Sequence, residues 1–370
     1  MELFLYDRAL NMLGIVDEIS SLVWTRRYWD CGEFRLLVPM TPRHAELLTL
    51  GRWVARKDDK EVGQIRYIHI TCDAQGLEQI EVQGKFLTHW LGNRLLLSPI
   101  IMTAPTDQTL RRIVRETLVE PPDLGRRISG LGIDNTPLQG IASIASACDL
   151  YDNALVACSD RAKLAKIGFR IETDLRAKTH AFVVYKGLDR TTTQAENAIC
   201  IFSPDFDNVL SQEYTRSVEN VATAIYVSGA SEEGQAQEVA EVLDGVSSGI
   251  DRIEFFYDAS SLTRSYSDGG VQTQIPDSEY TALLQARGEQ VLDQKDESLS
   301  FSSVIDMRAN LKYKRDFDLG DRVTCLNQRW RIQIDARITE ITETYESGKQ
   351  DLEATFGVSI PSLSEMLKWR

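Results

Sequence analysis

The chain has 370 residues, of which 43% are hydrophobic and 26% charged, a composition typical of a folded protein of roughly two to four domains. Its 41 basic and 55 acidic residues give a net charge of −14, which argues against a dedicated nucleic-acid binder held by phosphate contacts. The N-terminus lacks the features of a signal peptide, and no apolar run approaches the ~20 residues of a membrane span. We therefore expect a protein made in the cytoplasm, with no membrane span.

Residues 1–96 are predicted to form a first small antiparallel β-barrel. Short segments rich in β-branched and aromatic residues follow one another with few helical stretches between them. Residues 73–76 (DAQG) are typical of a β-hairpin turn in which Gly76 supplies a positive φ. The strands are expected at residues 2–6, 16–24, 32–39, 64–71 and 77–83.

Residues 97–203 change character and are predicted to form an inserted α+β domain. A helix should be capped by Thr106 or Asp107 and run to about Val119, because two prolines follow at 121–122. A second helix is expected over residues 150–165, followed by strands at 168–172 and 181–185. The apolar face of the first helix repeats with helical spacing at Leu110, Ile113, Val114, Thr117 and Leu118.

A second small β-barrel is predicted in two pieces, residues 204–230 and 299–359, because the first piece is too short to close alone. Residues 231–298 then form a second inserted α+β domain, and the fold class is mainly β with two α+β inserts. Within 204–298 we expect strands at 224–228 and 252–257, helices at 235–243 and 280–294, and a loop at 265–270. Further strands are expected at 299–305, 322–326, 330–334, 337–345 and 351–356, before a C-terminal tail of residues 360–370 that forms a short helix.

We predict no catalytic, cofactor or metal site, and we interpret the chain as not an enzyme. The histidines are scattered without metal-ligand spacing, at His44, His69, His89 and His180. Residues 245–249 (GVSSG) match the GxSxG pattern of a nucleophilic serine at Ser247. A hydrolase needs a strand before this motif, a helix after it and a later histidine, whereas this context is interpreted as a helix end and a loop.

The acidic residues and the cysteines also predict no functional site. Residues 316–321 (DFDLGD) lack the glycine and the final glutamate that a calcium loop requires at its sixth and twelfth positions, and favour a polar turn. Asp205 and Asp207 are unremarkable in a chain with 55 acidic residues. The cysteines have no CxxC spacing and are expected to be reduced and mostly buried; they are Cys31, Cys72, Cys148, Cys158, Cys200 and Cys325.

Four segments, in a consistent order along the chain, carry a resemblance to a known family. They are residues 21–39 (SLVWTRRYWDCGEFRLLVP), 182–191 (FVVYKGLDRT), 313–324 (YKRDFDLGDRVT) and 354–357 (ATFG). The chain resembles the hub proteins of phage tails, particularly siphovirus-like tail-tip hubs and prophage baseplate hubs.

The resemblance implies a structural component of the virion tail. Hubs of this family have two related small β-barrels, each with an α+β insert, and three copies form a ring that joins the sixfold tail tube to the threefold tip. The implied partners are a tail tube or distal tail protein, the tape-measure protein and a tip spike or fibre. DNA would pass through the lumen during ejection without specific binding, and the lytic extension of some relatives is expected to be absent.

The net charge also predicts where basic and acidic residues lie in the homotrimer. An even spread of negative charge would oppose the apposition of three copies, so we expect basic residues to gather at the subunit contacts and acidic residues to line the lumen. The basic candidates are Arg26, Arg27, Arg35 and Arg322, with Trp24 or Trp330 as buried aromatic anchors.

Two other functions remain open on the sequence alone. A carbohydrate-active hydrolase would need two close carboxylates in a cleft of each subunit. A tail module that binds host polysaccharide would instead need exposed aromatic side chains along a groove, for which the candidates are Trp24, Trp29 and Trp53.

Overall fold

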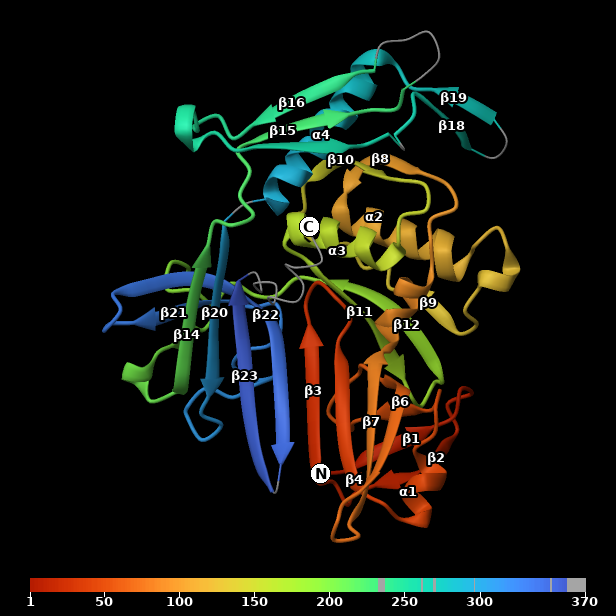
Figure 1. Cartoon of the computed structure of the whole chain (residues 1–370), viewed down its shortest axis with the longest axis vertical. Coiled ribbons are helices and arrows are strands. Elements are labelled where there is room, and N and C mark those ends of the chain that lie inside the picture. Colours follow the sequence, from red (N-terminus) through yellow and green to blue (C-terminus); the bar gives the residue numbers. More distant parts are fainter. Residues whose placement is uncertain (232–236, 261, 269–270, 296, 347, 358–370) are drawn as a thin grey trace.

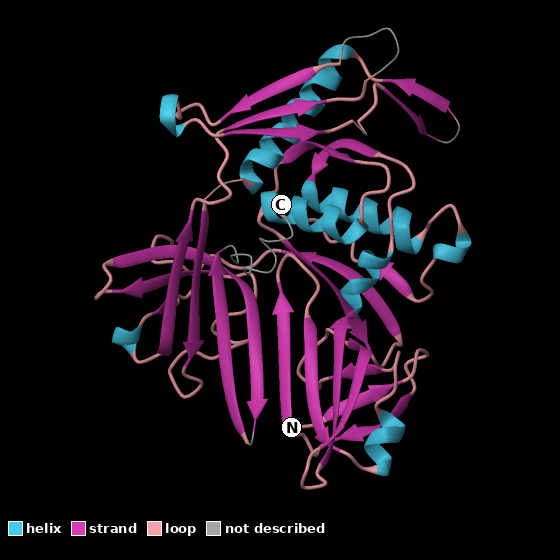
Figure 2. Cartoon of the chain, viewed as in Figure 1, coloured by secondary structure: helices cyan, strands magenta, loops and turns pink. Residues whose placement is uncertain are grey.

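Most strands of the chain belong to one continuous sheet, which joins residues from both halves of the sequence (Figure 1). The computed structural model describes residues 1–370 except 232–236, 261, 269–270, 296, 347 and 358–370. The sheet has 13 strands in the order β14-β20-β23-β22-β3-β4-β7-β6-β5-β1-β2, with β13 and β21 attached beside β22. The chain is therefore mainly β, as predicted, with the longer helices gathered in the two inserted regions (Figure 2).

The N-terminal strands form what we call the first β-unit. Its hairpin turn has the expected geometry, because Gly76 has φ +80° and its N–H donates to the Asp73 carbonyl at 3.0 Å. The apolar residues of its strands alternate with polar ones and close over Trp24 and Phe34 in a common core. The elements are β1 (Leu3–Tyr6), β2 (Met12–Val16), β3 (Ser21–Arg27), β4 (Glu33–Pro39), α1 (Pro42–Leu47), β5 (Trp53–Ala55), β6 (Gly63–Cys72) and β7 (Glu78–Phe86).

The first insert follows and has the predicted helices and strands. The first helix starts after Pro105, without a side-chain cap, so the expected cap on Thr106 or Asp107 is wrong. Asn153 caps the second helix by accepting from the N–H groups of Leu155 and Val156. The elements are η1 (Leu87–Asn93), β8 (Ile100–Pro105), α2 (Thr106–Val114), the π-helical turn η2 (Arg115–Val119), η3 (Leu124–Arg126), β9 (Leu131–Ile133), β10 (Ser143–Cys148), α3 (Ala154–Ala165), β11 (Gly168–Asp174) and β12 (Thr179–Tyr185).

The second β-unit is assembled from two separate stretches of the chain. Strand β14 pairs with β20, so residues on either side of the second insert share one sheet. The strands expected at 330–334 and 337–345 form one long strand, β22, whose second half pairs with both β23 and β3. The elements are β13 (Ile201–Phe202), η4 (Pro204–Phe206), β14 (Val209–Ser217), β20 (Ser298–Ile305), β21 (Arg322–Asn327), β22 (Ile332–Glu346) and β23 (Lys349–Gly357).

The second insert departs from the prediction at three places. The strand at 224–228 pairs with β16 and β17 rather than with the second β-unit, and the helix expected at 235–243 is strand β16 where it is described. The loop expected at 265–270 begins with a strand, β18, paired with β19. The elements are β15 (Ala224–Ser228), β16 (Val239–Leu243), η5 (Gly249–Asp251), β17 (Glu254–Asp258), β18 (Ser265–Asp268), β19 (Val271–Gln274) and α4 (Asp277–Gln294).

These corrections share a physical reason. Val239, Glu241 and Leu243 are exposed while Ala240 is buried, which is the two-residue period of a strand packed on one face. The pairing of β15 with β17 is parallel, so it joins segments that short-range sequence patterns do not connect. Helix α4 covers the buried face of this sheet, and its Tyr280, Leu283 and Leu284 enter a separate core. The predicted helix of the C-terminal tail lies outside the described residues.

The two β-units are joined side by side instead of standing apart. Strand β3 pairs antiparallel with β22 over seven residue pairs, from Arg27 opposite Glu340 to Ser21 opposite Glu346. The segment that follows β12 also approaches the second β-unit closely, because a Cβ on Gly187 would lie 1.9 Å from the carbonyl oxygen of Gly320. Among the described strands the pairing runs as an open path, with β2 and β14 at its two ends.

Candidate assembly surfaces

The junction between the β-units contains a buried cluster of charges centred on Arg26. The Arg26 guanidinium donates to Glu61 at 3.0 Å, to the Tyr313 hydroxyl at 2.8 Å and to Asp318 at 3.2 Å. Burial opposes the charge of Arg26, but Tyr313 and the nearby carboxylates outweigh it and raise the pKa of the guanidinium. Glu61 comes from the first β-unit, and Asp318 from the second. Arg26 therefore binds the two units together within one chain.

A second arginine of the first β-unit repeats this arrangement at the junction. Arg56, which follows β5, makes two hydrogen bonds of 2.9 Å each to the buried carboxylate of Glu343 on β22. It also donates to Asp58, and its guanidinium lies 5.5 Å from the ring centres of Trp24 and Tyr345. A bidentate, buried pair fixes orientation as well as distance. The relative placement of the two β-units is thus set by paired charges.

The arginines expected at subunit contacts lie in different environments. Arg26 is only 5% exposed, so the prediction that it contacts another subunit is wrong. Arg27 is half-buried between Glu33 and Glu340. Arg35 and Arg322 are exposed and pair with Glu81 and Asp189, and their place at a subunit contact stays a prediction.

The tryptophans do not form an exposed binding groove. Trp24 is fully buried, where its Nε1 donates to Asp59 at 3.0 Å and its ring packs on Phe86. Trp53 is buried against His180. Trp29 is partly buried against the same core as Trp53. The alternative of a polysaccharide groove lined by Trp24, Trp29 and Trp53 is therefore not supported, and Trp24 cannot anchor another subunit. Trp330 is 46% exposed and remains available for contact.

One face of the continuous sheet is polar across both β-units. Strand register places side chains that are directly opposite one another on the same face. One row runs through Tyr67, Gln83, Arg35, Val23, Thr344 and Asp351. The next row runs through Lys85, Glu33, Thr25, Thr342, Glu353, Val304 and Ser211. This polar face crosses the junction without interruption.

The two ends of the polar face differ in charge. Over the first β-unit it contains a groove of about 460 Å³ whose charged lining residues are Arg35, Arg66, Lys85 and Glu33. Since Glu33 is the one carboxylate lining this groove, the groove lacks the carboxylate pair of a glycosidase. Over the second β-unit, burial and the neighbouring Glu340 and Glu213 raise the pKa of Glu353. Carboxylates therefore lie close together over the second β-unit, whereas the groove over the first β-unit is lined mainly by basic residues.

The serine of the GxSxG motif has no hydrolase context. Strand β16 precedes it and the three-residue turn η5 follows, so the motif follows a strand and not the predicted helix. The Ser247 hydroxyl donates to Asp244, whose carboxylate also accepts from the N–H groups of Val246 and Ser247. Its hydroxyl is used in a local turn, and the four histidines belong to other regions of the chain.

The candidate metal ligands are used in the fold. His89 Nδ1 contacts the Phe86 carbonyl, and His180 Nδ1 contacts the Thr173 hydroxyl. In the 316–321 segment, Asp318 binds Arg26 and Asp321 binds Arg190. Within the described ranges, no three His, Cys, Asp or Glu side chains gather as a metal-binding group. The absence of catalytic, cofactor and metal sites stays a prediction.

All six cysteines are unpaired, in agreement with the sequence-based prediction of reduced residues. Cys72 is exposed on the hairpin of the first β-unit, and the others are buried. Burial raises the pKa of the Cys148 thiol to about 11, which disfavours the reactive thiolate. In the part of the chain that the structure describes, no helix is both long and apolar enough to cross a membrane.

Comparison with known proteins finds one matching family and several solved structures with a similar fold. A family model described as Siphovirus ReqiPepy6 Gp37-like protein matches residues 2–358. No curated protein matches the chain. Among solved structures, a tail protein from Neisseria meningitidis MC58 is similar over 96% of each chain, with 10% identity and a TM-score of 0.59.

Two prophage proteins show the same fold over nearly their whole length. The 43 kDa tail protein of prophage MuSo2 from Shewanella oneidensis has 11% identity and a TM-score of 0.58, covering 96% of this chain and 98% of its own. The prophage tail protein gp18 from Listeria monocytogenes EGD-e has 11% identity and a TM-score of 0.56, covering 100% and 99%. At such low identity, these similarities establish the fold alone.

Proposed function

Because the chain belongs to the Siphovirus ReqiPepy6 Gp37-like protein family, we propose that it is the hub of a phage or phage-derived tail tip. Its family and fold are those of structural phage tail proteins, and its place is the virion tail. The observation that carries the hub proposal is the continuous sheet that joins two β-units within one chain. Each subunit thus contributes two β-units to an assembly.

Three copies of a chain with two β-units provide six units around one axis. Each β-unit, the first within residues 1–96 and the second from residues 204–230 and 299–359, acts in this proposal as a small barrel. The ring then matches a sixfold tail tube on one side and a threefold tip on the other. The buried charges of Arg26 and Arg56 support this role, since they hold the two units of each copy in a fixed orientation.

The polar face of the sheet is the proposed wall of the conduit for DNA and the tape-measure protein. Side chains such as Thr342, Thr344 and Glu353 offer hydration and negative charge, which favour passage of a polyanion without binding. The remaining proposed partners are the tail tube or distal tail protein and a tip spike or fibre. No catalytic step is part of this function.

Sedimentation and electron cryo-microscopy of the purified chain test the proposal. We expect a concentration-dependent species of three times the 41.7 kDa chain mass, with a central opening. In the density map, Thr342, Thr344 and Glu353 should face that opening. A chain that stays monomeric at high concentration, or a ring whose opening is lined by other strands, contradicts the proposal.

A further inference from the structure

The net negative charge of the chain is concentrated in one stretch. Residues 201–300 contain 19 acidic and 5 basic residues, and the other 270 residues contain 36 of each. Most of this stretch is the second insert, from β15 to α4. The net negative charge therefore belongs largely to one module and not to the β-units expected to line the lumen, and the surface of this module should select a partner of opposite charge.

The acidic module ends in an exposed apolar projection, which we call the tip. The loop between β16 and β17 exposes Val246 by 88% and Ile250 by 99%, and Leu243 and Ile253 beside it are also exposed. In Figure 1 this loop, with its short helix η5, projects from the upper left end of the molecule. Aliphatic side chains this exposed are typical of a contact surface.

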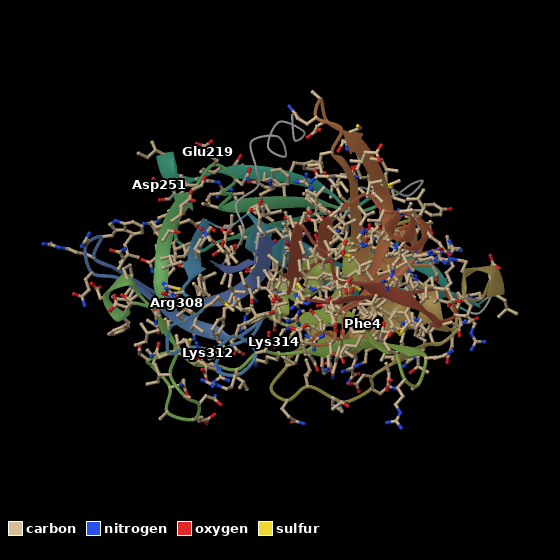
Figure 3. All side chains as sticks on the ribbon, turned by 90° about the horizontal axis from the view of Figure 1, so that it is seen from below. Phe4, Glu219, Asp251, Arg308, Lys312 and Lys314 are labelled. Atoms are coloured by element: carbon tan, nitrogen blue, oxygen red, sulfur yellow. The ribbon has the colours of Figure 1, made fainter. Side chains whose placement is uncertain are left out.

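In the described part of the chain, three carboxylates without cationic partners lie beside the tip, in addition to Glu241 and Glu254, which pair with Arg252. Asp244 accepts N–H groups of its own loop, and among the described residues neither it nor Asp251 lies within ion-pair distance of a basic side chain. Glu219 also has no such partner there, and Figure 3 shows Glu219 and Asp251 at the same corner of the molecule. The tip thus combines an apolar centre with an acidic rim.

The first insert has a surface of the complementary kind, which we call the patch. Backbone hydrogen bonds join its segments: Tyr151 N–H donates to the Leu96 carbonyl at 2.8 Å, and Leu96 N–H donates to Asp152 at 2.9 Å. An Arg126 side chain hydrogen-bonds the Leu95 carbonyl and brings η3 to the same place. The exposed apolar side chains of the patch are Leu95, Leu97, Leu124, Tyr151 and Val156.

The rim of the patch is basic. Arg94 and Arg126 donate to backbone carbonyls, and Arg127 is exposed on the same turn. Within the described ranges, no carboxylate lies within ion-pair distance of these three arginines. The patch therefore has an apolar centre and three arginines without carboxylate partners among the described residues, beside Asp123 and Asp152 of the same loops. These arginines are opposite in charge to the unpaired carboxylates of the tip.

Backbone strain at Tyr151 points to a binding role for the patch. Tyr151 has φ +68°, in the left-handed region that bulky side chains rarely adopt, and its side chain is 64% exposed. Core packing does not explain this conformation, because the ring projects into solvent. Backbone hydrogen bonds from Tyr151 N–H to Leu96 and from Asp152 N–H to Asp149 hold the strained turn, which presents an exposed aromatic ring at the patch.

We propose that the tip of one copy docks on the patch of the next copy in the ring. This inference rests on the proposed trimer and names the surfaces that close it. Figure 1 places η5 and η3 on opposite sides of the molecule, so one copy cannot satisfy both surfaces and the contact must run head to tail. The apolar centres supply affinity, and the opposite rims set the register.

Single substitutions on the full chain, followed by sedimentation, test the contact. Because Ile250 touches little else in the chain, Ile250→Ser should leave folding unchanged and raise the trimer dissociation constant about tenfold or more. Leu50→Ser is the matched control, since Leu50 is 65% exposed in the first β-unit, outside both surfaces. The control should leave trimer dissociation unchanged.

Charge reversal then identifies the partner of the tip. Asp251→Arg and Arg127→Asp should each weaken the trimer, and the two together in one chain should restore it at least partly, because each head-to-tail contact regains an opposite pair. A trimer of unaltered strength in Ile250→Ser, or no restoration in the double variant, overturns this contact while the proposed hub stands. If the tip variants trimerise normally but lose another tail protein, the tip serves that partner instead. A wild-type chain that never trimerises overturns both proposals.

Discussion

The two inserts occupy equivalent places between β-segments, yet they are built in opposite ways. The first insert shares its core with the first β-unit, so that Phe169 and Phe182 pack in the same cluster as Trp53. The second insert has a core of its own, formed by α4 and β15 around Ile225 and Leu284. The first is nearly neutral, and the second carries most of the acid excess. The first insert is therefore integrated with the sheet, whereas the second insert is a separate acidic module that we propose contacts partners.

The largest expected effect comes from the shared core of the first insert. Phe169→Ala removes a fully buried ring that contacts Phe182 and should lower the free energy of unfolding by about 3–5 kcal/mol. Because this core includes Trp53 and Val62 of the first β-unit, both regions should lose stability together. Hydrogen exchange measures this directly. Loss of protection confined to β11 and β12 would contradict the claim that the first insert shares its core with the first β-unit.

The same truncation in the second insert should have a local result. Leu284→Ala removes most of a buried side chain from the separate core and should lower the free energy of unfolding by about 2–5 kcal/mol. We expect faster exchange of amides in β15, β16 and α4, with β3, β4 and β7 unchanged. Leu50→Ala, at an exposed position of the first β-unit, is a control expected to change little. A global loss of protection in Leu284→Ala would show that the second insert is as integrated as the first.

Lowering the pH should destabilise the first insert more than the second, because the second insert contains no histidine. Burial lowers the pKa of His180 in the first insert, and of His89 just before it, from 6.5 to about 4. Below pH 6.5 the unfolded chain binds protons that the folded chain does not, so stability is lost as the pH falls from 6.5 towards 4. The loss at pH 5 should be roughly 1–2 kcal/mol per histidine.

Thermal unfolding and hydrogen exchange at pH 7 and pH 5 check this result. His180→Gln should reduce the pH dependence around the first insert, while His69→Gln, on the exposed part of β6, should not. Since the second insert contains no histidine, its protection should change less over this range. Equal losses in both inserts would contradict the assignment to His180 and His89.

The smallest expected effect concerns Tyr151. Tyr151→Asn places a residue that tolerates φ +68° in the strained position and should raise the free energy of unfolding by up to about 1 kcal/mol. The same change removes an exposed aromatic from the patch and should weaken the trimer. Denaturant unfolding and sedimentation of one variant therefore separate strain relief from contact. A loss of stability would show that the ring supports the fold.

Local signals explain which elements were predictable. The DAQG turn, the prolines after α2 and the amphipathic face of α2 all act within a few residues, and each gave the expected element. The helix expected at 235–243 was wrong because this segment is stabilised as a strand by pairing with β15. The strand at 224–228 was correct, but its assignment to the second β-unit was wrong because its parallel partner β17 lies beyond β16 in the chain. Arg26 was placed at a subunit contact because a charged side chain rarely lies in a core unless it is paired. Its partners Glu61 and Asp318 are 35 and 292 positions away.

By itself the sequence determined the class of the protein, since composition, strand-forming segments and four spaced segments suffice to indicate a mainly β tail protein. Only the tertiary structure decided that β3 pairs with β22, that Trp24 is buried and that the tip and patch face opposite sides. The reason is physical: turns, caps and hydrophobic periodicity are local interactions, whereas sheet order and ion pairing depend on which distant segments meet after the chain has folded.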